Sequence, residues 1–118
     1  MNYISIIEKI LEEYKQKLGI NDAIKVKIKR YKTKTAFTNL KTRTIYVNRD
    51  MLDLGEDVIK YLILHELIHI KLNNKYHDHE FFKILYEYIS PEELTKVRSL
   101  VNEKFIDKSH QLKTKEIK

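Results

Sequence analysis

The chain has 118 residues, enough for one hydrophobic core, so we expect a single domain over residues 1–118. Its formal net charge is +6, and it contains only two glycines and one proline. This composition argues against a disordered chain and favours a compact fold rich in helix. Cysteine is absent from the sequence, which excludes disulfides and leaves nitrogen and oxygen atoms as the ligands for any metal ion.

Neither a targeting segment nor a membrane span is apparent. The N-terminal sequence MNYISIIEKILEEYKQKLG has acidic residues inside its apolar pattern and lacks a small-residue cleavage site. The longest uncharged apolar run, YLIL at 61–64, is too short to cross a bilayer. We therefore expect a soluble, cytoplasmic protein without a membrane partner.

The first half of the chain predicts a helix and a small sheet. In residues 4–18 apolar side chains recur every three or four positions, which predicts an amphipathic helix ending at Gly19. Residues 24–31 alternate Ile or Val with Lys, the pattern of a half-buried strand. The β-branched and aromatic segments 35–40 and 44–48 predict a hairpin, giving a sheet of three strands.

The second half predicts three helices. A long helix begins at Glu56, with acidic residues in its first turn. A second helix is expected over residues 78–89. Ser90 and Glu93 form a capping box that opens a third helix, which we expect to run to about residue 106 before a frayed polar tail. The predicted fold class is therefore α+β.

The segment HELIH, residues 65–69, carries an HExxH motif on the long predicted helix. His65 and His69 stand one turn apart on the same face, so both can bind one metal ion. Glu66 projects beside that face and is placed to take a proton from a water molecule that the metal activates. The alternative is that both histidines are ordinary core or boundary residues of an apolar helix.

A catalytic zinc ion takes three protein ligands and keeps a fourth position open, so a third ligand is needed. The pattern HExxHxxGxxH is excluded, because Leu72 and Lys75 occupy its glycine and histidine positions. The remaining candidates are Glu80, Glu87, His77 and His79. His77 is favoured because it would continue the helical stripe of Phe81 toward the HELIH helix. His79 stays open, since the start of that helix is uncertain by one or two residues.

The sequence TIYVNRDMLDLGEDVIKYLILHELIHIKLNNKYHDHEFF resembles the core of small HExxH metallopeptidases: a strand ending in asparagine, a short loop, an HELxH helix and then HxxxF. SprT-like proteases and the minigluzincins share this pattern, and the minigluzincin fold is similar to the catalytic domains of HtpX- and BlaR/MecR-type membrane peptidases. The resemblance covers residues 36–89 and is greatest to the minigluzincins. It implies peptide hydrolysis with zinc bound by His65, His69 and His77, and Glu66 as the general base.

Two further parts of a peptidase are expected. The strand 35–40 or its neighbour could pair with an extended peptide substrate by edge addition. Such enzymes usually add a donor that stabilises the oxyanion of the reaction. The sequence offers several candidates without choosing among them: Tyr86, Tyr88, His79 and Arg98.

The C-terminal segment 91–118 lies beyond the motif. Its helically spaced apolar residues predict packing, and these are Val97, Leu100, Val101 and Phe105. Minigluzincins occur in latent forms in which C-terminal segments obstruct the cleft, so the resemblance implies a latency segment here, with His110 able to reach the metal. Exchange of this helix between protomers would give a latent homodimer.

The segment 24–49 contains nine Lys or Arg residues and no Asp or Glu. An alternative function follows from it: a SprT-like, nucleic-acid-associated metalloprotein whose lysine row contacts phosphates. The other interpretation is a solvated sheet face, which is favoured because few aromatic residues, such as Tyr31 and Phe37, are interleaved with the lysines to stack on bases. Salt-sensitive retention on DNA that survives Glu66→Ala would favour the nucleic-acid interpretation.

Overall fold

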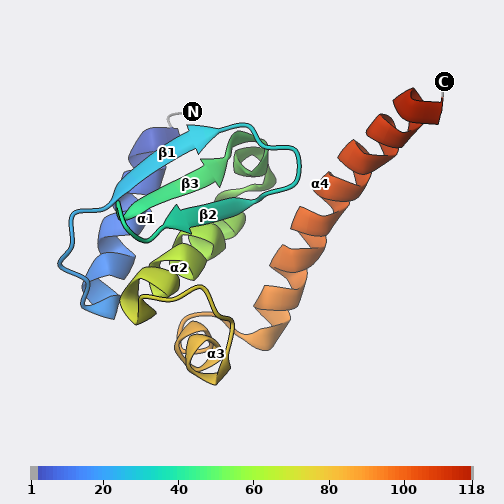
Figure 1. Cartoon of the computed structure of the whole chain (residues 1–118). Helices are drawn as coiled ribbons and strands as arrows, with labels where there is room; N and C mark the ends of the chain where they lie inside the picture. The colour runs from blue at the N-terminus through green and yellow to red at the C-terminus, as the bar shows by residue number, and fades with distance from the viewer. Residues whose placement is uncertain (1–2, 118) are drawn as a thin grey trace.

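The computed structural model describes the backbone of residues 3–117 and the side chains of residues 3–105. The elements in chain order are α1 (Tyr3–Leu18), β1 (Lys25–Lys29), β2 (Ala36–Asn39), β3 (Thr44–Asn48), the 3₁₀ helix η1 (Arg49–Leu54), α2 (Glu56–Leu72), α3 (His79–Leu85) and α4 (Pro91–Ile117) (Figure 1). The predicted α+β class, with an N-terminal helix before a three-stranded sheet, is confirmed.

The sheet has the strand order β1-β3-β2. β1 runs parallel to β3, and β2 is antiparallel to β3, so the predicted hairpin is confirmed. The central strand buries Ile45 and Val47 on the sheet's inner face. Thr38 of β2 is paired with Ile45 and therefore also faces inward, because side chains alternate along a strand. Phe37 points to the outer face, where its ring stacks on the ring of Tyr46.

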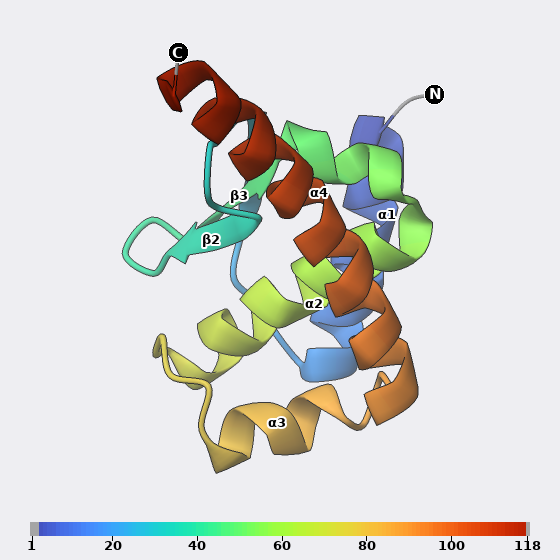
Figure 2. The same ribbon diagram turned by 90° about the vertical axis from the view of Figure 1, so that its right-hand side faces the viewer.

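α2 is the central element of the fold. It contacts α1, both β2 and β3, η1, α3 and α4, so it is covered by the sheet on one side and by helices on the others (Figures 1 and 2). Most of its residues are buried in consequence. The helix ends at Asn73, whose left-handed backbone conformation lets its N–H bond the carbonyls of His69 and Ile70. The HExxH motif thus lies on a rigid and almost fully enclosed helix.

α3 is shorter than the sequence predicts. It spans His79–Leu85 rather than 78–89. At its start, the Asp78 side chain accepts a hydrogen bond from the backbone N–H of Phe81 and caps the helix. At its end, the N–H groups of Glu87 and Tyr88 bond carbonyls only three residues back, so residues 86–88 form a turn. His77 consequently precedes the helix instead of continuing its apolar stripe, so the helical argument that favoured His77 is wrong.

α4 opens with the predicted capping box. The Glu93 N–H donates to the Ser90 hydroxyl, and the Ser90 N–H donates to the Glu93 carboxylate. The core extends into this helix through buried residues that pack beside α2, namely Leu94, Val97 and Val101.

The prediction of a frayed tail is wrong, because the helix continues to Ile117 through a segment without glycine or proline. Ile106 and His110 lie outside the described side chains.

Within residues 3–117, none of the helices combines the length and the apolar composition that a membrane span requires.

Asn48 fixes the loop that leads into β2. Its side chain is fully buried at the end of β3, and its amide donates to the carbonyl oxygens of Tyr31 and Lys34 at 2.9 and 2.7 Å. The amide oxygen accepts a hydrogen bond from the Asp50 N–H at 3.0 Å. Since β2 begins directly after this loop, Asn48 helps to set where the strand lies against α2.

We expect Asn48→Ala to lower the free energy of unfolding by about 3 kcal/mol, because it removes three hydrogen bonds made by a fully buried amide. Asn39→Ala is the matched control: its exposed side chain only accepts from the N–H groups of Lys41 and Thr42, so the loss should stay below about 1 kcal/mol. Urea denaturation of both variants measures the difference. Equal losses would show that the Asn48 bonds do not hold the loop.

Candidate metal centre

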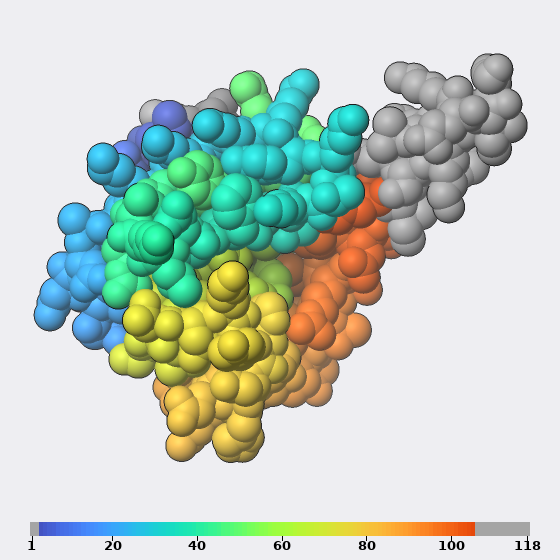
Figure 3. Space-filling view, viewed as in Figure 1, coloured from blue at the N-terminus to red at the C-terminus, as the bar shows by residue number. Residues whose placement is uncertain are grey.

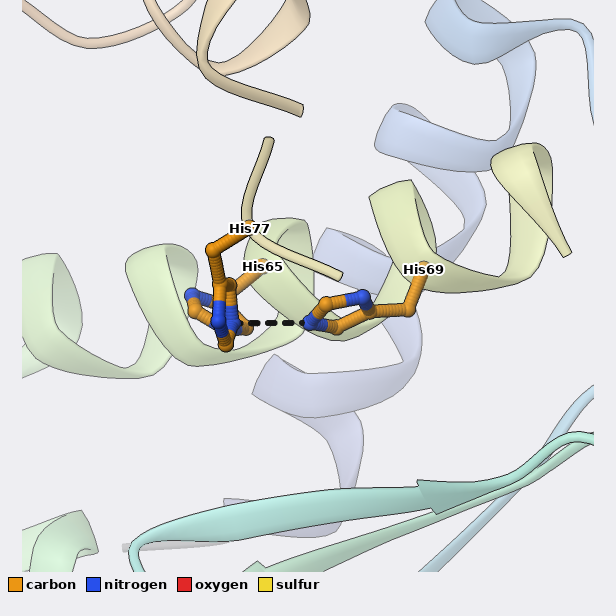
Figure 4. Close-up of side chains that lie close together, drawn as sticks. All are labelled: His65, His69 and His77. Atoms are coloured by element: carbon orange, nitrogen blue, oxygen red, sulfur yellow. Dashed lines mark hydrogen bonds between the residues drawn. The ribbon is translucent and has the colours of Figure 1, made fainter. Parts of the chain in front are cut away.

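Three histidines meet beside α2. His65 and His69 come from the helix, and His77 comes from the loop before α3 (Figure 4). The Nε2 atom of His77 lies 3.0 Å from Nε2 of His65 and 3.1 Å from Nε2 of His69. Ligands of a tetrahedral zinc ion bonded at about 2.0–2.1 Å lie about 3.3 Å from one another. The three ligand nitrogens, which all lie within 4.8 Å of one another, are therefore close enough to share a single ion of this size.

The second ring nitrogens of the two helical histidines have their own partners. Nδ1 of His69 lies 3.0 Å from the carbonyl oxygen of Asn74, which can only accept, so the Nδ1 atom carries the proton. In neutral His69 the lone pair is then on Nε2 and points into the cluster. Nδ1 of His65 lies 3.1 Å from the hydroxyl of Tyr61. Such contacts fix the ring orientation and the tautomer of metal-binding histidines.

Phe81 of α3 supports the cluster from behind. Its buried ring lies with its centroid 4.8 Å from those of His65 and His69 and 4.9 Å from that of His77. This aromatic contact holds all three imidazoles from one side and reduces the water around them. This contact gives a structural reason for the phenylalanine of the HxxxF pattern, since Phe81 follows His77 by four residues.

The electrostatic setting keeps the helical histidines neutral. Burial lowers the pKa of His65 to about 3, with the positive charges of His69, His77 and Arg98 adding to the effect. Burial also lowers the pKa of His69. A metal ligand must be the neutral imidazole, so both residues are in the binding form at neutral pH without first losing a proton.

Glu66 lies on the sheet side of α2 and is only 5% exposed. Its carboxylate oxygen Oε1 accepts a hydrogen bond of 2.9 Å from the hydroxyl of Thr38 on β2. Burial raises the pKa of Glu66 to about 7, and the Thr38 hydrogen bond opposes that rise. A carboxylate with a pKa near neutrality is suited to accept and return a proton at physiological pH.

A cleft runs between β2 and α2. It is lined by residues 36–38 of the strand, by the three histidines with Glu66, and by Asn74 and Lys75 of the following loop. On the face shown in Figure 3, the strand residues in teal lie next to the yellow residues that follow α2. The three residues that the HExxH argument selected and the favoured third histidine, His77, therefore share one cleft.

The other candidates lie elsewhere. His79, Glu80 and Glu87 are exposed and are not part of the histidine group found among the described residues. The residues lining the cleft do not include any of the four candidate oxyanion donors. The hydroxyl of Tyr88, for example, donates to the carbonyl of Lys17 on α1. The choice of a third ligand and of an oxyanion donor stays a prediction.

Two residues of the site were not predicted. Tyr61 precedes His65 by four positions, so the same helical spacing that paired His65 with His69 could have placed it. No sequence signal marks Thr38, because its contact with Glu66 depends on how β2 lies across α2.

On the outer sheet face the lysines of β1 lie in register with β3, with Lys27 opposite Tyr46. Whether that face binds nucleic acid also stays a prediction.

Comparison with known proteins agrees with this geometry. Residues 2–102 match the family described as YgjP-like, metallopeptidase domain. The chain belongs to this family. The metallopeptidase class expected from HExxH is thereby confirmed, and a peptide or protein is the class of substrate.

Two relatives of this YgjP-like metallopeptidase align over most of its length. An uncharacterized protein of Aquifex aeolicus is 43% identical over 82 residues, covering 69% of this chain and 74% of the relative. An uncharacterized protein of Methanocaldococcus jannaschii is 36% identical over 113 residues, covering 92% and 96%.

Two crystal structures of metallopeptidase zymogens share the fold. Jannalysin of Methanocaldococcus jannaschii has a TM-score of 0.76 and 33% identity, with 83% of this chain and 88% of that chain covered. Abylysin of Pyrococcus abyssi also has a TM-score of 0.76, with 28% identity and coverage of 83% and 93%. The predicted resemblance to minigluzincin-type metallopeptidases is confirmed.

The raised pKa of Glu66 predicts a pH-dependent stability in metal-stripped protein. Below its ordinary pKa of 4.5 the carboxyl is protonated in both the folded and the unfolded chain, so the folded state bears no cost of a buried charge. Above about pH 7 it is ionised in both, and the folded state bears the full cost of the buried charge. Wild-type protein should therefore lose on the order of 3 kcal/mol of unfolding free energy relative to Glu66→Gln as pH rises from 4.5 to 7.

Urea denaturation of both proteins in a chelator across this pH range measures the difference. The histidine titrations are common to both proteins and cancel. Parallel stability curves would mean that Glu66 is not buried as a titrating carboxyl.

Proposed function

We propose that this metallopeptidase is a zinc-dependent endopeptidase in which His65, His69 and His77 hold the metal and Glu66 is the general base. The convergence of three Nε2 atoms in a cleft that Glu66 also lines carries the proposal. Three imidazoles form a donor set that suits zinc and leaves a fourth position for a reacting molecule. The raised pKa of Glu66 supports its role as a proton carrier.

When bound, zinc would supply a Lewis acid that acidifies water and polarises the scissile carbonyl. Glu66 takes the proton from the attacking water and later gives it to the leaving amine. The Thr38 hydroxyl occupies Oε1 of Glu66, which leaves Oε2 free to carry that proton. Thr38 thereby keeps the base in one orientation during both transfers.

The substrate would bind along β2. In the sheet order β1-β3-β2 this strand is an edge, and three of its residues line the cleft. An extended peptide that pairs with this edge would run past Glu66 and the histidines, with its backbone rather than its side chains recognised. Thr38 would then link the strand that holds the peptide to the base that acts on it.

Metal analysis tests the ligand set. We expect wild-type protein to carry close to one zinc ion per chain, and His77→Ala to lose most of it, because two imidazoles alone bind zinc weakly. His79→Ala is the matched control and should keep the metal, since His79 is exposed on α3 and outside the cluster. Plasma mass spectrometry measures the content.

Glu66→Gln separates the base from the ligands. It should keep the zinc yet hydrolyse casein at least about 100-fold more slowly, because general-base assistance contributes a factor of that size. Loss of metal in His79→Ala but not in His77→Ala would reassign the third ligand. A folded wild-type protein without bound metal would refute the proposed function.

We also propose that residues 1–118 form one domain whose C-terminal segment keeps the enzyme latent, either in its own cleft or in that of a partner copy. The similar fold of two zymogens supports latency. Leu94, Val97 and Val101 are buried, and Phe105 packs against the core, so a latency segment would begin after Phe105.

A chain that ends at Phe105 tests latency and keeps the α4 residues that pack on the core from Leu94 to Phe105. We expect it to hydrolyse casein several-fold faster than the full-length chain at equal zinc content and equal melting temperature. If the segment acts between two copies, dilution should also activate full-length protein, because dissociation would release the cleft. Equal rates for the two chains at every concentration would rule out obstruction by residues 106–118.

A further inference from the structure

Tyr61 connects the metal cluster to the C-terminal helix. It lies on α2 one turn before His65, is only 8% exposed, and places its hydroxyl 3.1 Å from Nδ1 of His65. The two rings pack edge to face, with their centroids 5.5 Å apart. From α4, the Arg98 side chain lies close enough to the Tyr61 hydroxyl to lower the pKa of Tyr61 by hydrogen bonding and by charge, against the larger rise that burial causes. Figure 2 shows α4 crossing over α2 in the arrangement that allows this contact.

The chemistry of the hydroxyl fits a support for His65. A neutral imidazole that binds a metal through Nε2 carries its proton on Nδ1, and that proton needs an acceptor. The phenolic oxygen of Tyr61 has two lone pairs. Arg98 can only donate, so it uses one of them and leaves the other for the Nδ1–H of His65. His69 has an equivalent acceptor in the carbonyl of Asn74.

We propose that Tyr61 and Arg98 are positioning residues that hold His65 in its metal-binding tautomer and ring orientation, so that α4 contributes to metal affinity. This inference rests on the proposed metal site. It assigns a specific role to the hydroxyl, beyond the packing of the Tyr61 ring in the core. The positive charge of Arg98 also acts on His65 directly and lowers its pKa, so the contact with Tyr61 has to be tested separately from that charge.

Removal of the hydroxyl tests the first half of the proposal. In full-length protein, Tyr61→Phe should raise the zinc dissociation constant 10- to 100-fold, about the effect of losing a partner of a metal-bound histidine. Competition with a chelator of known affinity measures it. Tyr88→Phe is the matched control, because it removes another hydrogen-bonded hydroxyl, which donates to the Lys17 carbonyl, and should leave the zinc affinity unchanged.

A double-mutant cycle tests the second half. Arg98→Met should weaken zinc binding several-fold. Combined with Tyr61→Phe it should cause no further loss, because Arg98 acts through the missing hydroxyl. If the two losses of zinc affinity multiply in the double variant, Arg98 acts by another route. That result would refute the claim that Arg98 acts through Tyr61. Tighter binding in Arg98→Met would also overturn it, since this would mean that repulsion between two cations is the larger effect.

The absorption bands of bound cobalt give a second readout that a purely structural role would not change. A tilted His65 ring should alter the bands in both Tyr61→Phe and Arg98→Met, while Tyr88→Phe should keep the wild-type spectrum. Arg98→Met is an exposed substitution, so it keeps the test available if Tyr61→Phe does not fold. Failure of wild-type protein to bind metal would refute the proposed function. Normal wild-type binding with unchanged affinity in Tyr61→Phe would refute this inference alone.

Discussion

The enclosure of α2 is the constraint on which the rest of the structure depends. A helix that is covered by a sheet and three other helices cannot leave its polar side chains to water, and unpaired polar groups in such a setting are costly. Each polar group of the motif therefore has a partner from another part of the fold. Glu66 is paired with Thr38 of β2, and His69 with the loop after the helix. None of the buried side-chain nitrogen or oxygen atoms in the described residues lacks a hydrogen-bond partner.

The same partners prepare the site for chemistry. A hydrogen bond that satisfies a buried imidazole at Nδ1 also directs the Nε2 lone pair, and a hydroxyl that satisfies one carboxylate oxygen directs the other. Burial lowers the pKa of His65 and raises that of Glu66, which are opposite shifts with one physical cause. Stability and reactivity thus have a common origin in this small chain. The protein needs no separate scaffold to orient its candidate catalytic residues.

The sequence predicted what depends on local spacing. The HExxH helix, the hairpin and the capping box at Ser90 all follow from patterns within a few residues. The bounds of α3 did not follow, because Asp78 caps the helix from outside and turn hydrogen bonds at Glu87 and Tyr88 end it at Leu85. His77 reaches the cluster from a loop, so the prediction named the right neighbour of His65 through a wrong geometry. The contact between Thr38 and Glu66 spans 28 positions and arises from strand register, which local patterns do not determine.

α4 shows why the C-terminal segment cannot be treated as an appendage. Its first turns bury Leu94, Val97 and Val101 against α2, and Arg98 on the same turns contacts Tyr61 beside the metal cluster. A truncation before this helix would remove core packing together with a support of His65, so low activity in such a chain would say nothing about latency. The useful boundary lies after Phe105, which itself packs against the core. The residues up to that point belong to the folded enzyme, and the proposed obstruction of the cleft is assigned to the residues after it.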